Sequence, residues 1–146
     1  MASGKGNNNS ILYLGAIFQA VFTGVPSLLA NAGSPLTNLY VSLYTANPGA
    51  SGNQTSNEAA YTSYARVAVA RTVSGWSISS ETIANVAAVT FPACTGGTET
   101  ENYVGIGTLA TLAGNLLWFG QLTTPLAVSA GITPSFAIGA LTITES

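Results

Sequence analysis

The chain has 146 residues, of which 5% are charged: three are Lys or Arg, five are Glu, none is His or Asp, and the formal net charge is -2 at pH 7. Three cations cannot form a basic patch for nucleic acid. The absence of His and Asp excludes a Ser-His-Asp triad and a His-ligated metal, and a single Cys excludes an intramolecular disulfide. Since the chain is also 47% hydrophobic and lacks the charge that keeps a free monomer soluble, we expect it to act by contact within a larger assembly.

Residues 1–32 are expected to form an N-terminal docking arm. Within them, residues 11–30 form an uncharged apolar stretch, ILYLGAIFQAVFTGVPSLLA. Two alternatives compete: the stretch nearly has the length of a membrane span, and the Ala-Asn-Ala at 30–32 resembles a signal-peptide cleavage site. Polar interruptions and the lack of a basic flank favour a helical or extended arm on another protein, with a break near Val25 because Pro26 follows it.

From Asn38 onward the pattern is that of short β-strands. In 38–45, for example, Leu39, Val41 and Leu43 recur at every second position, so they share one face. Such strands, separated by turn signals at near-regular spacing, predict an all-β fold, a jelly-roll-like β-sandwich over residues 33–146, with an immunoglobulin-like sandwich as second choice. The eight expected strands are 38–45, 64–72, 75–79, 82–91, 103–109, 115–122, 126–128 and 136–144.

Paired carboxylates are one pattern that could carry catalysis. Glu99 and Glu101 lie two residues apart, so an extended segment would place them on one face, as glycoside hydrolysis requires of two acids across a cleft. An exposed turn around Gly96-Gly97, covering 94–102, is the favoured interpretation, because nothing in the sequence marks a raised pKa or a sugar groove.

The other reactive or glycine-rich positions have structural interpretations. Cys94 has no His to activate it, which predicts a small, buried and inert thiol. Gly105 and Gly107 are too few for a phosphate loop and are interpreted as strand positions where backbones or rings approach closely. We therefore expect no catalytic residue, no cofactor and no metal ligand.

Protein contact is the expected role of several further side chains. Arg66 and Arg71 lie five residues apart in one expected strand, hence on opposite faces. Each could pair with a Glu of this chain, make a bidentate contact with a partner protein, or lie at a solvated edge. The candidate interface residues are Ile11, Leu12, Tyr13, Ile17, Phe18, Phe22, Arg66 and Arg71.

Four segments carry a resemblance to a known family. They are TSYARVAVAR from Thr62, VTFPACTGG from Val89, VGIGTLAT from Val104 and LTTPLAVSAGITPSFAIGALTIT from Leu122. Together they resemble small tailed-phage structural proteins usually labelled tail-fibre protein, and the resemblance runs from about Asn38 to the C-terminus. Jelly-roll chains of this size are also similar to cement, or head-decoration, proteins of short-tailed phages.

The resemblance implies a virion structural protein without catalysis. The first expectation is a capsid cement protein on the capsid exterior, whose partners are the major capsid protein and other copies of itself as a dimer or trimer, with no nucleic acid and no membrane. The alternative is a tail-fibre or baseplate component of the virion, with a host glycan as an optional ligand. A secreted or periplasmic binding module is third, and an enzyme is the least favoured class.

Overall fold

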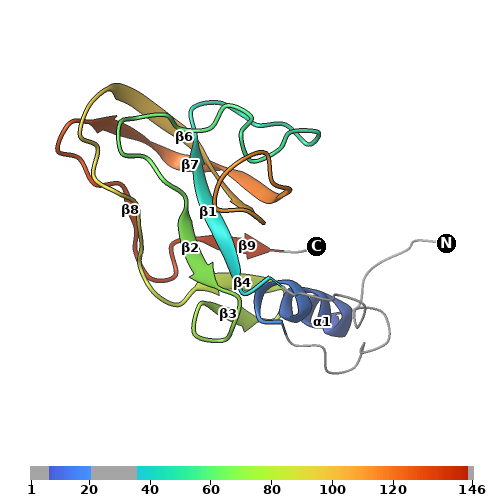
Figure 1. Cartoon of the computed structure of the whole chain (residues 1–146). Helices are drawn as coiled ribbons and strands as arrows, with labels where there is room; N and C mark the ends of the chain where they lie inside the picture. The colour runs from blue at the N-terminus through green and yellow to red at the C-terminus, as the bar shows by residue number, and fades with distance from the viewer. Residues whose placement is uncertain (1–6, 21–35, 145–146) are drawn as a thin grey trace. The chain divides into compact units, whose positions relative to one another are not determined.

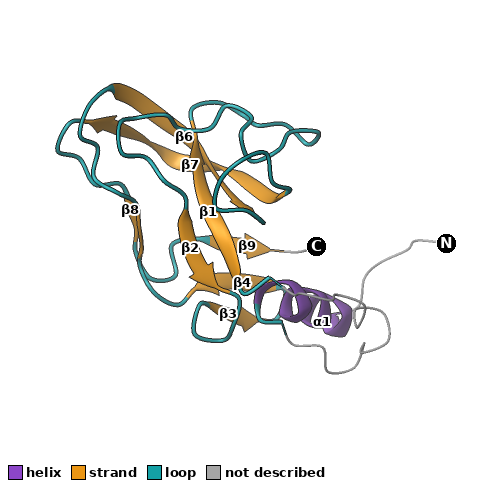
Figure 2. Cartoon of the chain, viewed as in Figure 1, coloured by secondary structure: helices purple, strands orange, loops and turns teal. Residues whose placement is uncertain are grey.

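The computed structural model describes residues 7–20 and 36–144 (Figure 1). Within them, one short helix, α1 (Asn7–Phe18), precedes the strands, which Figure 2 shows in orange. The all-β class with a short N-terminal helix is therefore confirmed. The strands are β1 (Asn38–Tyr44), β2 (Val67–Ala70), β3 (Trp76–Ser79), β4 (Thr82–Asn85), β5 (Val89–Thr90), β6 (Thr98–Gly107), β7 (Leu116–Ser129), β8 (Ser135–Phe136) and β9 (Thr142–Thr144).

The chain forms two compact units, each assembled from separate stretches of sequence. One unit comprises residues 38–69 and 89–135, and the other comprises 1–37, 70–88 and 136–146. The expected division into an arm at 1–32 and a sandwich at 33–146 stays a prediction.

The unit of residues 38–69 and 89–135 contains a four-stranded sheet with the order β2-β1-β6-β7. β1 pairs antiparallel with β6, so that Val41 lies opposite Ile106 and Leu43 opposite Val104. The side chains of Leu39, Val41 and Leu43 are all buried, as their alternation predicted. These residues form the core of the unit and fix the register of the central strands.

A glycine in β6 makes room for a ring of β1. A Cβ on Gly105 would lie 2.8 Å from Cε2 of Tyr44 and 2.7 Å from a methyl carbon of Leu116. The prediction that this glycine marks a close approach is confirmed. Because Gly105 has no side chain, the buried Tyr44 ring can occupy the space where a Cβ would lie.

β7 joins two segments that the sequence analysis expected to be separate strands, 115–122 and 126–128. Pro125 lies between them, and proline cannot donate to a strand ladder. In the structure the register with β6 shifts so that Leu126 lies opposite Glu101 while Gln121 lies opposite Tyr103. Residues 122–125 therefore stand opposite Asn102 alone, where regular pairing is interrupted and the missing N–H of Pro125 breaks no regular pair.

The second unit contains the sheet β3-β4-β9 together with α1. The Phe18 ring of the helix meets the Trp76 ring of β3 edge to face at 4.8 Å, and both side chains are fully buried. The Gln19 side chain donates to the Trp76 carbonyl oxygen at 2.7 Å. This aromatic contact fixes the end of α1 on the sheet.

Two expected strands are each interrupted in the structure. Residues 82–91 divide into β4 and β5, and residues 136–144 include parts of β8 and β9 with a turn between them. The buried Asn85 side chain hydrogen-bonds backbone groups in both interruptions. It donates to the carbonyls of Ala87 at 2.7 Å and Ala137 at 2.9 Å and accepts from the Leu141 N–H at 2.9 Å. A side chain can replace ladder bonds in this way only when the two segments are already adjacent.

The described part of the apolar N-terminal stretch is helical. Its helix, α1, has 12 residues, and no helix among residues 7–20 and 36–144 is long and apolar enough to cross a membrane. Phe22, the expected break near Val25 and the Ala-Asn-Ala at 30–32 lie outside the described residues.

Candidate functional site

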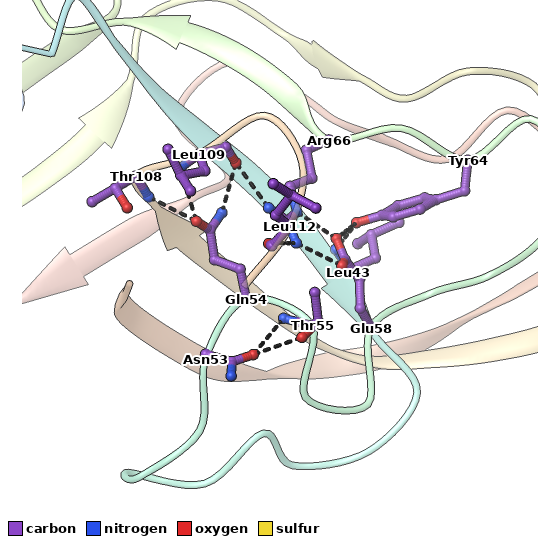
Figure 3. A network of polar contacts seen from close by, with 10 residues as sticks. All are labelled: Leu43, Asn53, Gln54, Thr55, Glu58, Tyr64, Arg66, Thr108, Leu109 and Leu112. Carbon is purple, nitrogen blue, oxygen red and sulfur yellow. Dashed lines mark hydrogen bonds and ion pairs between the residues drawn. The ribbon is translucent and has the colours of Figure 1, made fainter. Parts of the chain in front are cut away.

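An ion pair lies at the centre of the polar network in Figure 3. Arg66 precedes β2 and binds Glu58 with two bonds, from Nε to Oε1 at 2.6 Å and from Nη2 to Oε2 at 2.7 Å. The Arg66 side chain is only 2% exposed and that of Glu58 15%. The bonds to Glu58 raise the pKa of the Arg66 guanidinium, which therefore stays protonated. Of the alternatives that the sequence left open for Arg66, the structure shows the intramolecular Glu.

The same guanidinium holds the loop before β7. Nη1 donates to the Leu109 carbonyl and Nη2 to the Leu112 carbonyl, each at 2.9 Å. Carbonyls in an irregular loop need donors when water is excluded, and a planar guanidinium supplies several in fixed directions. Arg66 therefore fastens this loop to Glu58 on another loop, and we call the assembly of Glu58, Arg66 and the bound loop carbonyls the clasp.

Gln54 extends the clasp from the opposite side of the loop. Its Oε1 accepts from the N–H groups of Thr108 at 3.0 Å and Leu109 at 2.9 Å, and its Nε2 donates to the Leu109 carbonyl at 3.1 Å. The Gln54 side chain is fully buried, and a Cβ on Gly107 would lie 2.2 Å from its Cδ. Two glycines, Gly107 and Gly114, leave the space that this amide fills.

Tyr64 ties the clasp to β1. Its hydroxyl donates to Glu58 Oε1 at 3.0 Å and accepts from the Leu43 N–H at 3.1 Å. Burial, and then the charge of Glu58, raise the pKa of this hydroxyl, which keeps it a donor. Its ring also stacks on Phe91, with centroids 6.2 Å apart. The Glu58 carboxylate, the Arg66 guanidinium and the Tyr64 hydroxyl are thus all hydrogen-bonded within the clasp, which is a structural network.

The clasp presents an apolar loop. Leu112 has a positive φ of 69° and is 75% exposed, and Leu109 is also exposed. A left-handed conformation is unfavourable for leucine, so the surrounding bonds must hold it there. On β7, which follows, Leu117 and Phe119 are exposed, and the pairing with β6 is irregular at Leu117, which lies between the partners of Ile106 and Gly107.

The predicted exposed turn at Glu99 and Glu101 is wrong. β6 begins at Thr98, and pairing with β7 places Glu101 opposite Leu126 and fully buries it. Glu99 Oε1 accepts the N–H groups of Ala60 at 2.9 Å and Tyr61 at 2.7 Å. Burial, and then the adjacent Glu99, raise the pKa of Glu101 to about 8. The buried Glu101 carboxyl is therefore largely protonated at neutral pH, and neither of its oxygens has a hydrogen-bond partner in the described part of the chain.

The predicted interface residues near the N-terminus are divided between surface and interior. Tyr13 is 49% exposed, Ile17 is half-buried and Phe18 is buried against Trp76. The side chains of Ile11 and Leu12, and the whole of Phe22, lie outside the described part of the structure. The role of these residues in an interface stays a prediction.

Arg71 lies at the C-terminal end of α1. Its Nε and Nη2 donate to the Ile17 and Ala16 carbonyls, and Nη1 donates to the Leu36 carbonyl at 3.3 Å. A cation on the last carbonyls of a helix satisfies acceptors that have no partner within the helix and complements its dipole. Arg71, like Arg66, therefore bonds backbone oxygens of its own unit.

Two residues of the site were not singled out from sequence. Glu58 could have been found, because a chain with two Arg and five Glu offers few partners for a buried Arg. Gln54 gives no such signal, since nothing local distinguishes it from other loop amides. Cys94 is buried, as predicted, and its thiol donates to the Gly96 carbonyl at 3.2 Å. Among residues 7–20 and 36–144 no group of three or more His, Cys, Asp or Glu side chains could hold a metal.

Comparison with known proteins identifies one family. The family model described as Podophage GP4 fiber I protein gp80 matches residues 16–144. No curated protein matches the chain. The matched range contains all the strands, the clasp and both arginines.

Proposed function

The chain belongs to the podophage GP4 fiber I protein gp80 family and is a phage virion structural protein, and from this premise we propose that it is a tail-fibre component that acts by protein contact and without catalysis. The family confirms the resemblance to tail-fibre-labelled phage proteins. Its description favours the tail-fibre alternative over the capsid cement protein that was the first expectation. A host glycan as ligand stays a prediction.

The family match over residues 16–144 carries this proposal. The use of charge in the fold supports it. Arg66 is bound to Glu58 and loop carbonyls, Arg71 to helix carbonyls, and Glu99 to backbone N–H groups. Charges employed in this way stabilise a scaffold, and a surface that carries few ions can be covered by another protein with little of the desolvation cost of buried ions.

The location in the virion tests the proposal. Purified virions are labelled with an antibody against this chain and examined by immunogold electron microscopy, and the chain is quantified against the major capsid protein by gel densitometry. We expect gold at the tail and far fewer copies than of the capsid protein. Gold distributed over the head, with a copy number approaching that of the capsid protein, would instead establish a cement protein.

A further inference from the structure

A buried acid lies beside a break in the pairing of β6 with β7. Glu101 is fully buried, and neither of its carboxyl oxygens has a hydrogen-bond partner in the described part of the chain. It pairs with Leu126, directly before the register shifts so that Tyr103 pairs with Gln121. A buried polar group without a partner is costly, and a buried charge without one costs far more. The interior therefore accommodates this carboxyl in its neutral form.

The same break divides the β6–β7 pair into two parts with separate registers. The first part pairs residues 98–101 with 126–129, and we call these two segments the outer arm. The inner part pairs residues 103–107 with 116–121, and the same residues 103–107 also pair with β1. The outer part of β6 has only β7 as a strand neighbour among the described strands. It can therefore separate while the central strands stay paired, as the least supported part of a sheet does first.

The ionisable groups around Glu101 are acids. Glu99 lies two positions away on β6, Tyr61 approaches from the loop after β1, and Cys94 lies beside Tyr61 in the segment before β6. The β7 residue opposite, Leu126, is apolar, and both arginines of the described chain bind other groups, in the clasp and at the end of α1. Burial, and then Glu99, accordingly raise the pKa of Glu101 to about 8. An ionised Glu101 would have no counter-charge beside it, which favours its exit to water.

We propose that Glu101 is a pH-sensitive switch of the outer arm: as the pH rises and this carboxyl loses its proton, the two segments of the arm separate while the inner part of the β6–β7 pair stays closed. The carboxylate then reaches water. Glu99, which lies on the same segment, releases the N–H groups of Ala60 and Tyr61 that it now binds. The buried Cys94 thiol, which is bonded to a carbonyl just before the arm, becomes accessible.

Hydrogen exchange of the full chain tests the inference at pH values of about 6.5 and about 9.5, on either side of the Glu101 pKa. Rates are corrected for the intrinsic effect of pH on amide exchange. At the higher pH we expect the outer-arm amides to lose most of their protection and to become about tenfold or more less protected than those of β1. Glu101→Gln should keep the arm protected at both pH values, because the amide has no proton to lose. Glu81→Gln is the matched control: it makes the same change in the turn between β3 and β4 and should open like the natural chain.

Labelling of Cys94 by a thiol reagent gives a second measurement. At the higher pH the natural chain should react about tenfold or more faster than Glu101→Gln, and a comparison at one pH removes the effect of pH on the thiol itself. Circular dichroism verifies that the variants fold. An outer arm that stays as protected as β1 in the natural chain at the higher pH, or that opens equally in Glu101→Gln, would overturn the inference. Neither result bears on the tail location, so the two proposals fail separately.

Discussion

Individual ionisable residues in this protein serve the fold. Arg66 is held by Glu58 and by two loop carbonyls, and Glu101 is buried beside Glu99. A buried charge such as that of Arg66 is tolerated only when its partners are in place, whereas the buried Glu101 carboxyl holds a proton because its pKa is raised. Two predictions follow at this scale, one for the cation and one for the acid.

Replacing Arg66 should destabilise the protein strongly. Arg66→Met removes four hydrogen bonds and leaves Glu58 without its counter-charge, and breaking a buried pair from one side costs about 3–5 kcal/mol. Denaturant unfolding measures the loss. The double variant with Glu58→Leu is the control and should lose less than the sum of the single changes. A loss below about 1 kcal/mol in Arg66→Met would show that the clasp contributes little.

Glu101 should make the protein less stable as the pH rises. Its pKa in the folded chain is about 8, against an ordinary 4.5, so between these values the folded state holds a proton that the unfolded state has released. The free energy of unfolding therefore falls with rising pH in this window, by up to about 4 kcal/mol in total. Tyr61, which also faces Glu101, stays neutral there because burial raises its pKa to about 12.

Glu101→Gln should flatten this dependence, because the amide does not titrate. The measurement is denaturant unfolding from pH 4.5 to pH 8. Thr100→Gln is the matched control: it introduces the same amide at the exposed neighbouring position and should keep the slope. An unchanged slope in Glu101→Gln would mean that another group titrates.

Strands β6 and β7 show how an element depends on its neighbours. Gly105 and Gly120 are two glycines on this pair of strands, and Gly120 lies opposite Val104. A Cβ on Gly105 would meet Leu116, Tyr44 and the Trp118 carbonyl at 2.7–3.1 Å, whereas a Cβ on Gly120 would meet nothing within 4 Å. The local sequence does not distinguish these two glycines, but only at position 105 does the packing of neighbouring groups require a residue without a side chain.

Gly105→Ala should therefore lower the free energy of unfolding by about 1–3 kcal/mol through overpacking. Gly120→Ala adds the same methyl group in open space and should be neutral or slightly stabilising, since it restricts the unfolded chain. Thermal and denaturant unfolding of the two variants measure the difference. Equal effects at both positions would contradict the close packing of Tyr44 against Gly105.

At the scale of the whole molecule, the scarcity of charge is the dominant property. With 5% charged residues, the chain uses its described arginines internally and leaves a long uncharged strand at a sheet edge. A free monomer of this kind is poorly protected against association, whereas a virion component is covered by its neighbours. The tail-fibre proposal agrees with this property, because it places the chain among neighbouring proteins of the virion.

Part of the candidate site could be predicted from local sequence. The alternation of Leu39, Val41 and Leu43 predicted a buried strand face, and Gly105 predicted a close approach. The ion pair of Arg66 with Glu58, the contribution of Gln54 and the burial of Glu101 could not be predicted. The first two arise from the packing of loops that are distant in the sequence, and the third arises from strand register, neither of which a short segment encodes.

The sequence by itself determined the all-β class, because strand periodicity is a property of local sequence, whereas it left the apolar N-terminal stretch open as a helix or an extended arm. The tertiary structure decided which side chains hold the scaffold together. It joined 115–122 and 126–128 into one edge strand, turned both arginines toward backbone carbonyls and buried Glu101. These outcomes depend on which distant segments lie side by side, and burial and hydrogen bonding follow from that adjacency rather than from residue type.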